Sequence, residues 1–88
     1  MSYRVEITSQ AEKTLRKLDK ASQRRIAARI DELAENPRPR DCKKLADQDD
    51  LWRIRVGNFR IVYQVLDRKL LVLVIRIGDR KDIYRQLG

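Results

Sequence analysis

The chain has 88 residues, a formal charge of +8, one cysteine and no histidine. This length supports one small hydrophobic core, so we expect a single domain over residues 1–88. The residue counts exclude a disulfide framework, a structural zinc site and a histidine-based catalytic triad. We therefore expect neither a metal ion nor another cofactor.

The longest apolar run, Leu70–Ile75, is far shorter than the roughly 20 residues that a membrane helix needs. The N-terminus also lacks an apolar signal segment, so we expect a soluble cytoplasmic protein without a membrane partner. Residues 1–50 carry 12 basic and 10 acidic side chains, whereas residues 51–88 carry 9 and 3. This uneven charge is consistent either with a polyanionic partner or with a basic surface that has none.

The first half of the chain predicts one strand and two helices. Tyr3–Ile7 alternates in polarity and predicts a strand. Ser9–Glu12 fits the S-x-x-E capping box that begins a helix. A second amphipathic helix starts at Ala21 or Ser22 and ends at Asn36-Pro37, because the residue before proline is disfavoured in a helix. Together the two helices predict an antiparallel helical hairpin.

The second half predicts a loop and three strands. Residues 36–50 contain two prolines and many charged side chains, which is typical of a surface loop. Side chains then alternate over Leu51–Val56 and Phe59–Leu66, with a third strand over Leu70–Ile77, and Gly57-Asn58 marks a two-residue hairpin turn. The order β-α-α-β-β-β indicates an α+β fold, with the helical hairpin packed on one face of a mostly antiparallel sheet.

The hairpin turn predicts an arginine cluster. With Gly57-Asn58 as the turn, Arg55 lies opposite Arg60, and their Cβ atoms are about 4.5–5.5 Å apart. Arg53 lies on the same face, roughly 6.6 Å along the strand from Arg55. We call this side of the sheet the arginine face. Like charges placed opposite each other destabilise a sheet, so the cluster indicates either a phosphate site or three arginines extended into solvent.

The next turn decides what else shares the arginine face. A three-residue loop, Asp67–Lys69, places Arg76 opposite Arg60, whereas a two-residue loop turns Arg76 inward. We prefer the longer loop because a buried, unpaired arginine is costly. This choice also places apolar side chains beside the arginines, which suggests that a partner covers them. These side chains are Val62, Leu66, Leu70, Val72 and Val74.

The segment Leu51–Tyr63, LWRIRVGNFRIVY, resembles the R-x-R-x-G-x-[YF]-R-[IVL]-[IV]-Y signature of the RelE/ParE toxin superfamily. The element order is similar to that superfamily along the full chain. Ile77–Arg85 resembles the ending of the RelE branch, a basic stretch followed by a tyrosine. The resemblance implies the toxin of a type II toxin–antitoxin system. Such a toxin is a ribosome-dependent endoribonuclease that inhibits translation by cutting mRNA in the A site, and a cognate RelB-like antitoxin neutralises it.

Carried over by position, the resemblance implies an active site of Arg53, Arg55, Arg60, Arg80 and Tyr84. The implied reaction is attack of a ribose 2′-OH on the adjacent phosphate, without a metal ion, and preorganised arginines would stabilise the developing negative charge. Further RNA contacts are expected from Lys43, Lys44, Arg76 and Lys81. Antitoxin contacts are expected from Val62, Leu66, Val72 and Val74.

Several alternatives stay open. Arginine remains protonated, so the proton acceptor is Asp79, Tyr84 or ribosomal RNA. Tyr84 itself stacks on an unpaired base, orients the 2′-OH or anchors the C-terminal tail. The protein as a whole is alternatively a ParE-like toxin that poisons DNA gyrase without chemistry, or a basic binding module without toxicity. Arg80 and Tyr84 favour the nuclease, because a gyrase poison needs no tyrosine at a phosphate site.

Overall fold

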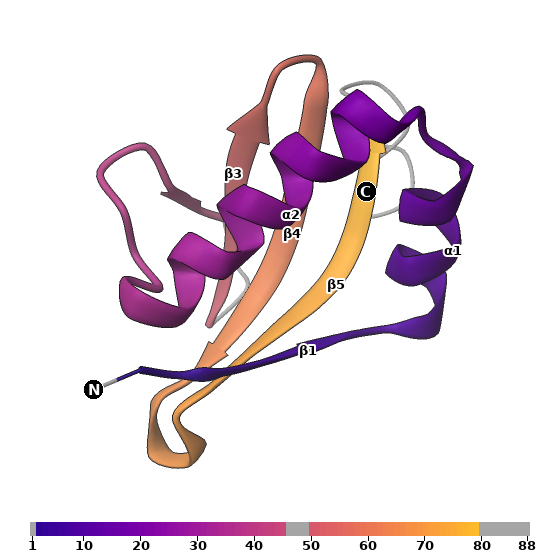
Figure 1. The fold of residues 1–88 in the computed structure, drawn as a ribbon. Helices are drawn as coiled ribbons and strands as arrows, with labels where there is room; N and C mark the ends of the chain where they lie inside the picture. The colour runs from indigo at the N-terminus through magenta and orange to yellow at the C-terminus, as the bar shows by residue number, and fades with distance from the viewer. Residues whose placement is uncertain (1, 46–49, 80–88) are drawn as a thin grey trace.

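The computed structural model describes residues 2–45 and 50–79. It shows a five-stranded sheet with strand order β1-β5-β4-β3-β2, in which β1 is parallel to β5 and the other neighbours are antiparallel. Both helices lie on one side of the sheet, where α2 crosses the strands and α1 lies beside β5 (Figure 1). The elements are β1 (Arg4–Ile7), α1 (Ser9–Lys17), α2 (Lys20–Glu35), β2 (Lys43–Lys44), β3 (Leu51–Val56), β4 (Phe59–Leu66), a 3₁₀ turn (Asp67–Lys69) and β5 (Leu71–Asp79).

The predicted α+β fold is therefore confirmed, with one addition. The expected loop over residues 36–50 contains a short edge strand, β2, which pairs with β3. Two lysines carry no alternating pattern, so sequence periodicity could not reveal this strand. Within the described residues, no helix has the length and apolar character needed to cross a membrane.

Side-chain caps fix where both helices begin. Thr8, not the predicted Ser9, caps α1: its hydroxyl oxygen accepts a hydrogen bond from the Ala11 N–H at 3.2 Å. The same hydroxyl donates to the Ile75 carbonyl at 2.8 Å, so the cap also attaches α1 to β5. Asp19 caps α2 by accepting hydrogen bonds from the hydroxyl and the N–H of Ser22, which hold the pKa of Asp19 below its usual value.

The core lies between the helices and the sheet. Tyr63 of β4 is fully buried, and its hydroxyl donates to the Pro37 carbonyl at 2.7 Å, which attaches the segment after α2 to the sheet. This burial raises the pKa of Tyr63, with a further contribution from the neighbouring Cys42. The core is formed by Ala11, Ile26, Ile30, Leu33, Ile54, Val56, Ile61, Tyr63, Val65, Val72, Val74 and Ile77.

The register of β3 and β4 confirms the prediction. Val56 lies opposite Phe59 and Arg55 lies opposite Arg60, with Gly57-Asn58 as the turn. Gly57 has a φ of +58°, a conformation that glycine adopts without the strain that a side chain would bring.

The register of β4 and β5 differs from the prediction. Leu70 adopts a left-handed conformation and extends the connection to four residues, so Leu66 pairs with Leu71. Val72 and Val74 consequently lie on the helix-covered face and are fully buried there. Their predicted position on the arginine face is wrong, and they are not accessible to an antitoxin.

A β-bulge then reverses this shift. The register slips between Val62 and Tyr63, so Ile75 has no partner and Arg76 lies opposite Val62. Arg76 therefore does share the arginine face, as predicted, but Gly78 takes its expected place opposite Arg60. Without the bulge, the side chain of Arg76 would point into the core.

Replacing Thr8 tests the cap that joins α1 to the sheet. Thr8→Ala removes the acceptor for the Ala11 N–H and the donor to the Ile75 carbonyl, so we expect it to lower the free energy of unfolding by about 1–3 kcal/mol in urea denaturation. Ser9→Ala is the matched control and should change it by less than about 0.5 kcal/mol. A larger effect at Ser9 than at Thr8 would return the cap to the position that the sequence predicts.

Candidate active site

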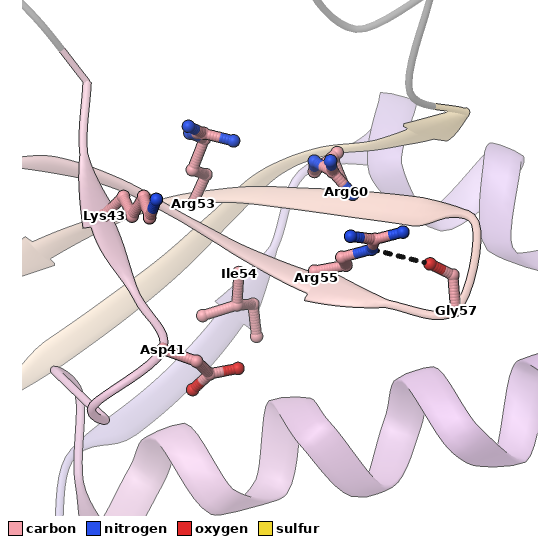
Figure 2. Close-up of a pocket in the computed structure, with 7 residues that line it drawn as sticks. All are labelled: Asp41, Lys43, Arg53, Ile54, Arg55, Gly57 and Arg60. Atoms are coloured by element: carbon pink, nitrogen blue, oxygen red, sulfur yellow. Dashed lines mark hydrogen bonds between the residues drawn. The ribbon is translucent and has the colours of Figure 1, made fainter.

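A cavity of about 550 Å³ opens at the edge of β3, beyond the end of the short strand β2 (Figure 2). Because β2 covers only two residues of β3, the rest of β3 toward the turn has no neighbour on that side among the described strands. Four of the seven lining residues are basic and one is acidic. The lining consists of Asp41, Lys43, Arg53, Ile54, Arg55, Gly57 and Arg60.

Arg60 is the most unusual residue of this cavity. Its side chain sits on the arginine face, yet only 7% of the residue is exposed. Its Nε and Nη1 atoms are buried and make no hydrogen bond with any part of the chain that the structure describes. A buried cation without acceptors is costly, so this geometry favours an anion as the missing partner.

Arg55 is held beside Arg60 by the turn. Arg55 is exposed, and its Nε donates to the Gly57 carbonyl at 3.2 Å. The two guanidinium groups lie next to each other near the turn in Figure 2, as the pairing of Arg55 with Arg60 requires. Two adjacent guanidinium groups match the oxygens of a phosphate, which would relieve their mutual repulsion.

The two lysines of β2 fall on opposite sides of the sheet. Lys43 pairs with Arg53 and therefore shares the arginine face, where it lines the cavity. Lys44 pairs with Trp52, whose side chain packs against the core, and so lies on the other face. The structure thus brings Lys43 to the predicted site and does not bring Lys44 there.

Asp41 is the acidic residue of the cavity, and no pattern in the sequence singles it out. Its carboxylate forms an ion pair with Arg29 of α2, which also pairs with Glu32 at 3.0 Å. These partners, Asp41 first, raise the pKa of Arg29. Because Arg29 already occupies this carboxylate, Asp41 is not free to neutralise the cavity arginines.

The remaining predicted residues divide into three groups. Asp79 pairs with Phe59 and therefore lies on the side of the sheet opposite Arg60, which removes it as a proton acceptor at that arginine. Val62 and Leu66 lie on the arginine face, as predicted, but Val62 is only 1% exposed, so its expected contact with an antitoxin is wrong. Arg80, Lys81 and Tyr84 lie outside the described residues.

Among the residues described, no group of three or more histidine, cysteine, aspartate or glutamate side chains is placed to hold a metal ion.

Comparison with known proteins identifies the family. A family model described as the ParE toxin of the type II toxin–antitoxin system parDE matches residues 5–84. A putative RelE-like toxin protein of Escherichia coli is 36% identical over 96% of this chain and 92% of its own length. The mRNA interferase toxin RelE of Escherichia coli K12 is 31% identical over 98% of this chain and 94% of its own length.

Solved structures agree with the sequence matches. The archaeal RelE–RelB complex from Pyrococcus horikoshii OT3 contains a chain that superposes with a TM-score of 0.82 at 35% identity, covering 92% of this chain and 98% of that one. The intact RelBE toxin–antitoxin complex of Escherichia coli gives a TM-score of 0.81 at 30% identity, with coverages of 91% and 99%. The fold, the arginine-lined cavity and these matches together show that the chain belongs to the RelE/ParE superfamily and is a RelE-like toxin of the type II toxin–antitoxin class.

Proposed function

We propose that this toxin is a ribosome-dependent endoribonuclease that cleaves mRNA in the ribosomal A site. The observation that carries the proposal is the buried guanidinium of Arg60, which faces the cavity without acceptors among the described residues. A phosphodiester supplies the negative oxygens that this group lacks. The similarity to a protein named mRNA interferase toxin RelE supports RNA as the source of that phosphate.

In the proposed reaction, a ribose 2′-oxygen attacks the adjacent phosphorus while the bond from phosphorus to the 5′-oxygen breaks. The 2′-OH loses its proton, and the leaving 5′-oxygen gains one. The products are a 2′,3′-cyclic phosphate and a 5′-OH. Negative charge grows on the non-bridging oxygens in the transition state, where Arg60 and Arg55 would stabilise it, with Arg53 alongside.

The proton acceptor is the part of the chemistry that the described cavity does not supply. Arginine stays protonated at neutral pH, and the Asp41 carboxylate is occupied by Arg29. Asp79 lies on the other side of the sheet. Our proposal therefore assigns proton acceptance to Tyr84 or to ribosomal RNA, and acceptance by ribosomal RNA would make the reaction depend on the ribosome.

A RelB-like antitoxin is the proposed regulatory partner. Several solved structures similar to this chain are RelE–RelB complexes, which supports such a partner here. An acidic segment would complement the arginines, and its apolar side chains would pack beside them on the exposed parts of the same face. Leu66, which is half-buried, remains the proposed contact, whereas Val62, Val72 and Val74 are withdrawn because all three side chains are buried.

The matching family model is described as a ParE toxin, which supports a second candidate function, namely inhibition of DNA gyrase without nuclease activity. Arg60 belongs to the signature that both branches of the superfamily share, so Arg80 and Tyr84 are the residues that favour the nuclease. Primer extension on translated messages distinguishes the two, because only the nuclease leaves codon-specific cuts. Inhibition of gyrase supercoiling without any cut would favour the poison.

Replacing Arg60 tests the proposed phosphate site. Arg60→Gln removes a preorganised cation, so we expect mRNA cleavage on translating ribosomes to fall by about 10²–10³-fold. The folded protein should be as stable as the wild type or slightly more stable, since an unpaired buried charge is lost. Arg68→Gln, in the exposed turn before β5, is the control and should retain full cleavage. Loss of folding in Arg60→Gln, measured by urea denaturation, would make Arg60 a structural residue.

The ribosome requirement is tested with purified RNA. The cavity offers cations but no free proton acceptor among the described residues, so we expect little or no cleavage of RNA in solution. Adding ribosomes that hold the same RNA as message should restore cleavage, because positioning alone contributes up to roughly 7–11 kcal/mol. Efficient, sequence-specific cleavage of purified RNA without ribosomes would contradict the requirement.

A further inference from the structure

Arg25 of α2 reaches the tip of the β3–β4 hairpin. A Cβ atom built on Gly57 would lie 3.1 Å from Nη2 of Arg25 and 3.6 Å from both Cζ and Nη1. The first distance is tight and the other two are ordinary van der Waals contacts, so the guanidinium group of the exposed Arg25 lies against the turn. Gly57 also lines the arginine cavity and accepts the hydrogen bond from Arg55. Arg25 and Arg55 therefore approach the same residue from two different elements.

Arg25 forms no ion pair with a carboxylate of the described residues, unlike several other arginines of the chain. Four arginines elsewhere hold carboxylates, in the pairs Arg4–Glu6, Arg16–Glu12, Arg29 with Glu32 and Asp41, and Arg38–Asp67. Around the hairpin tip, Arg25, Arg55 and Arg60 form no ion pair with any residue in 2–45 or 50–79. Guanidinium groups without a carboxylate partner in these residues therefore lie on both sides of Gly57, with Arg25 on α2 and Arg55 and Arg60 on the β3–β4 hairpin.

We propose that Arg25 binds a backbone phosphate of the same RNA, next to the phosphate held by Arg60. The inference rests on the proposed function. Phosphates recur at every nucleotide, so a strand that leaves the cavity across Gly57 presents its next phosphate to the guanidinium lying on that turn. The role of Arg25 is to position the strand, and it does not contact the reacting atoms.

Gly57 makes this arrangement feasible for two reasons. Its positive φ forms the tight turn, and its missing side chain leaves the space that the Arg25 guanidinium occupies. The sequence contains no signal for the contact between Arg25 and Gly57, because the two residues are far apart along the chain. The neighbouring Arg24 is also an arginine, so residue type does not distinguish Arg25 from it. Arg24 lines a different surface groove, between α1 and α2, and so provides a matched control on the same helix.

The test measures binding of the full chain to a five-nucleotide single-stranded RNA that carries a 2′-deoxy nucleotide at the cleavage position. We expect Arg25→Gln to weaken binding about two- to five-fold at low salt, as for loss of one exposed ion pair. The slope of log K against log salt should fall by about 0.7, as for one lost phosphate contact. Arg24→Gln should leave both quantities unchanged, and Arg25→Lys should keep most of the slope.

Replacing one RNA phosphate at a time with a neutral methylphosphonate identifies the phosphate that Arg25 contacts. The loss of RNA affinity caused by Arg25→Gln should vanish when the phosphate next to the cleavage position is neutral. It should persist when a more distant phosphate is neutral instead. If Arg25→Gln binds RNA like Arg24→Gln while Arg60→Gln still weakens binding, the inference is overturned and the proposed function stands. If Arg60→Gln also has no effect, both are overturned. If Arg25→Gln weakens only the complex with a purified RelB-like antitoxin, Arg25 is a protein contact and the inference is wrong.

Discussion

The pairing of Arg55 with Arg60 across the β3–β4 hairpin is the constraint on which the site depends. Two like charges opposite each other cost stability, and the burial of Arg60 increases that cost. The fold tolerates the pair because the neighbouring positions on the other face are strongly apolar and lie in the core, as Ile54 and Ile61 do. The core under the helices therefore offsets the cost of the pair, and Arg55 and Arg60 remain without a carboxylate partner among the described residues.

Two irregularities of β5 place Arg76 on the same face of the sheet as Arg55 and Arg60. The four-residue connection before β5 shifts the register of this strand, and the bulge at Ile75 shifts it back. The first part of β5 thus contributes Val72 and Val74 to the core, while Arg76 joins the arginine face. A bulge beside a functional site that redirects a side chain is a frequent use of this irregularity.

Contacts at the other end of the sheet hold the segment that leads into β2. Asp67, in the turn before β5, accepts two hydrogen bonds from Arg38 and one from Tyr3. Arg38 and then Tyr3 lower the pKa of Asp67, so the stability that these bonds contribute is present at neutral pH and is lost as the pH falls through the pKa of the folded protein. Arg38 also lies over the ring of Trp52, 5.4 Å from its centroid. These contacts fix the segment from which Asp41 and Lys43 extend toward the cavity.

Sequence by itself determined the α+β fold, the arginine pair and its register, because Gly57-Asn58 and strict alternation are local signals that a two-residue turn converts directly into pairing. It did not determine the β4–β5 register, since a left-handed leucine and a bulge leave no trace in an alternating pattern. Only the tertiary structure decided that β2 pairs with β3, that Arg60 is buried without acceptors in the described chain, and that Arg25 lies on Gly57. Each of these depends on contacts between segments distant in the chain, which no local pattern encodes.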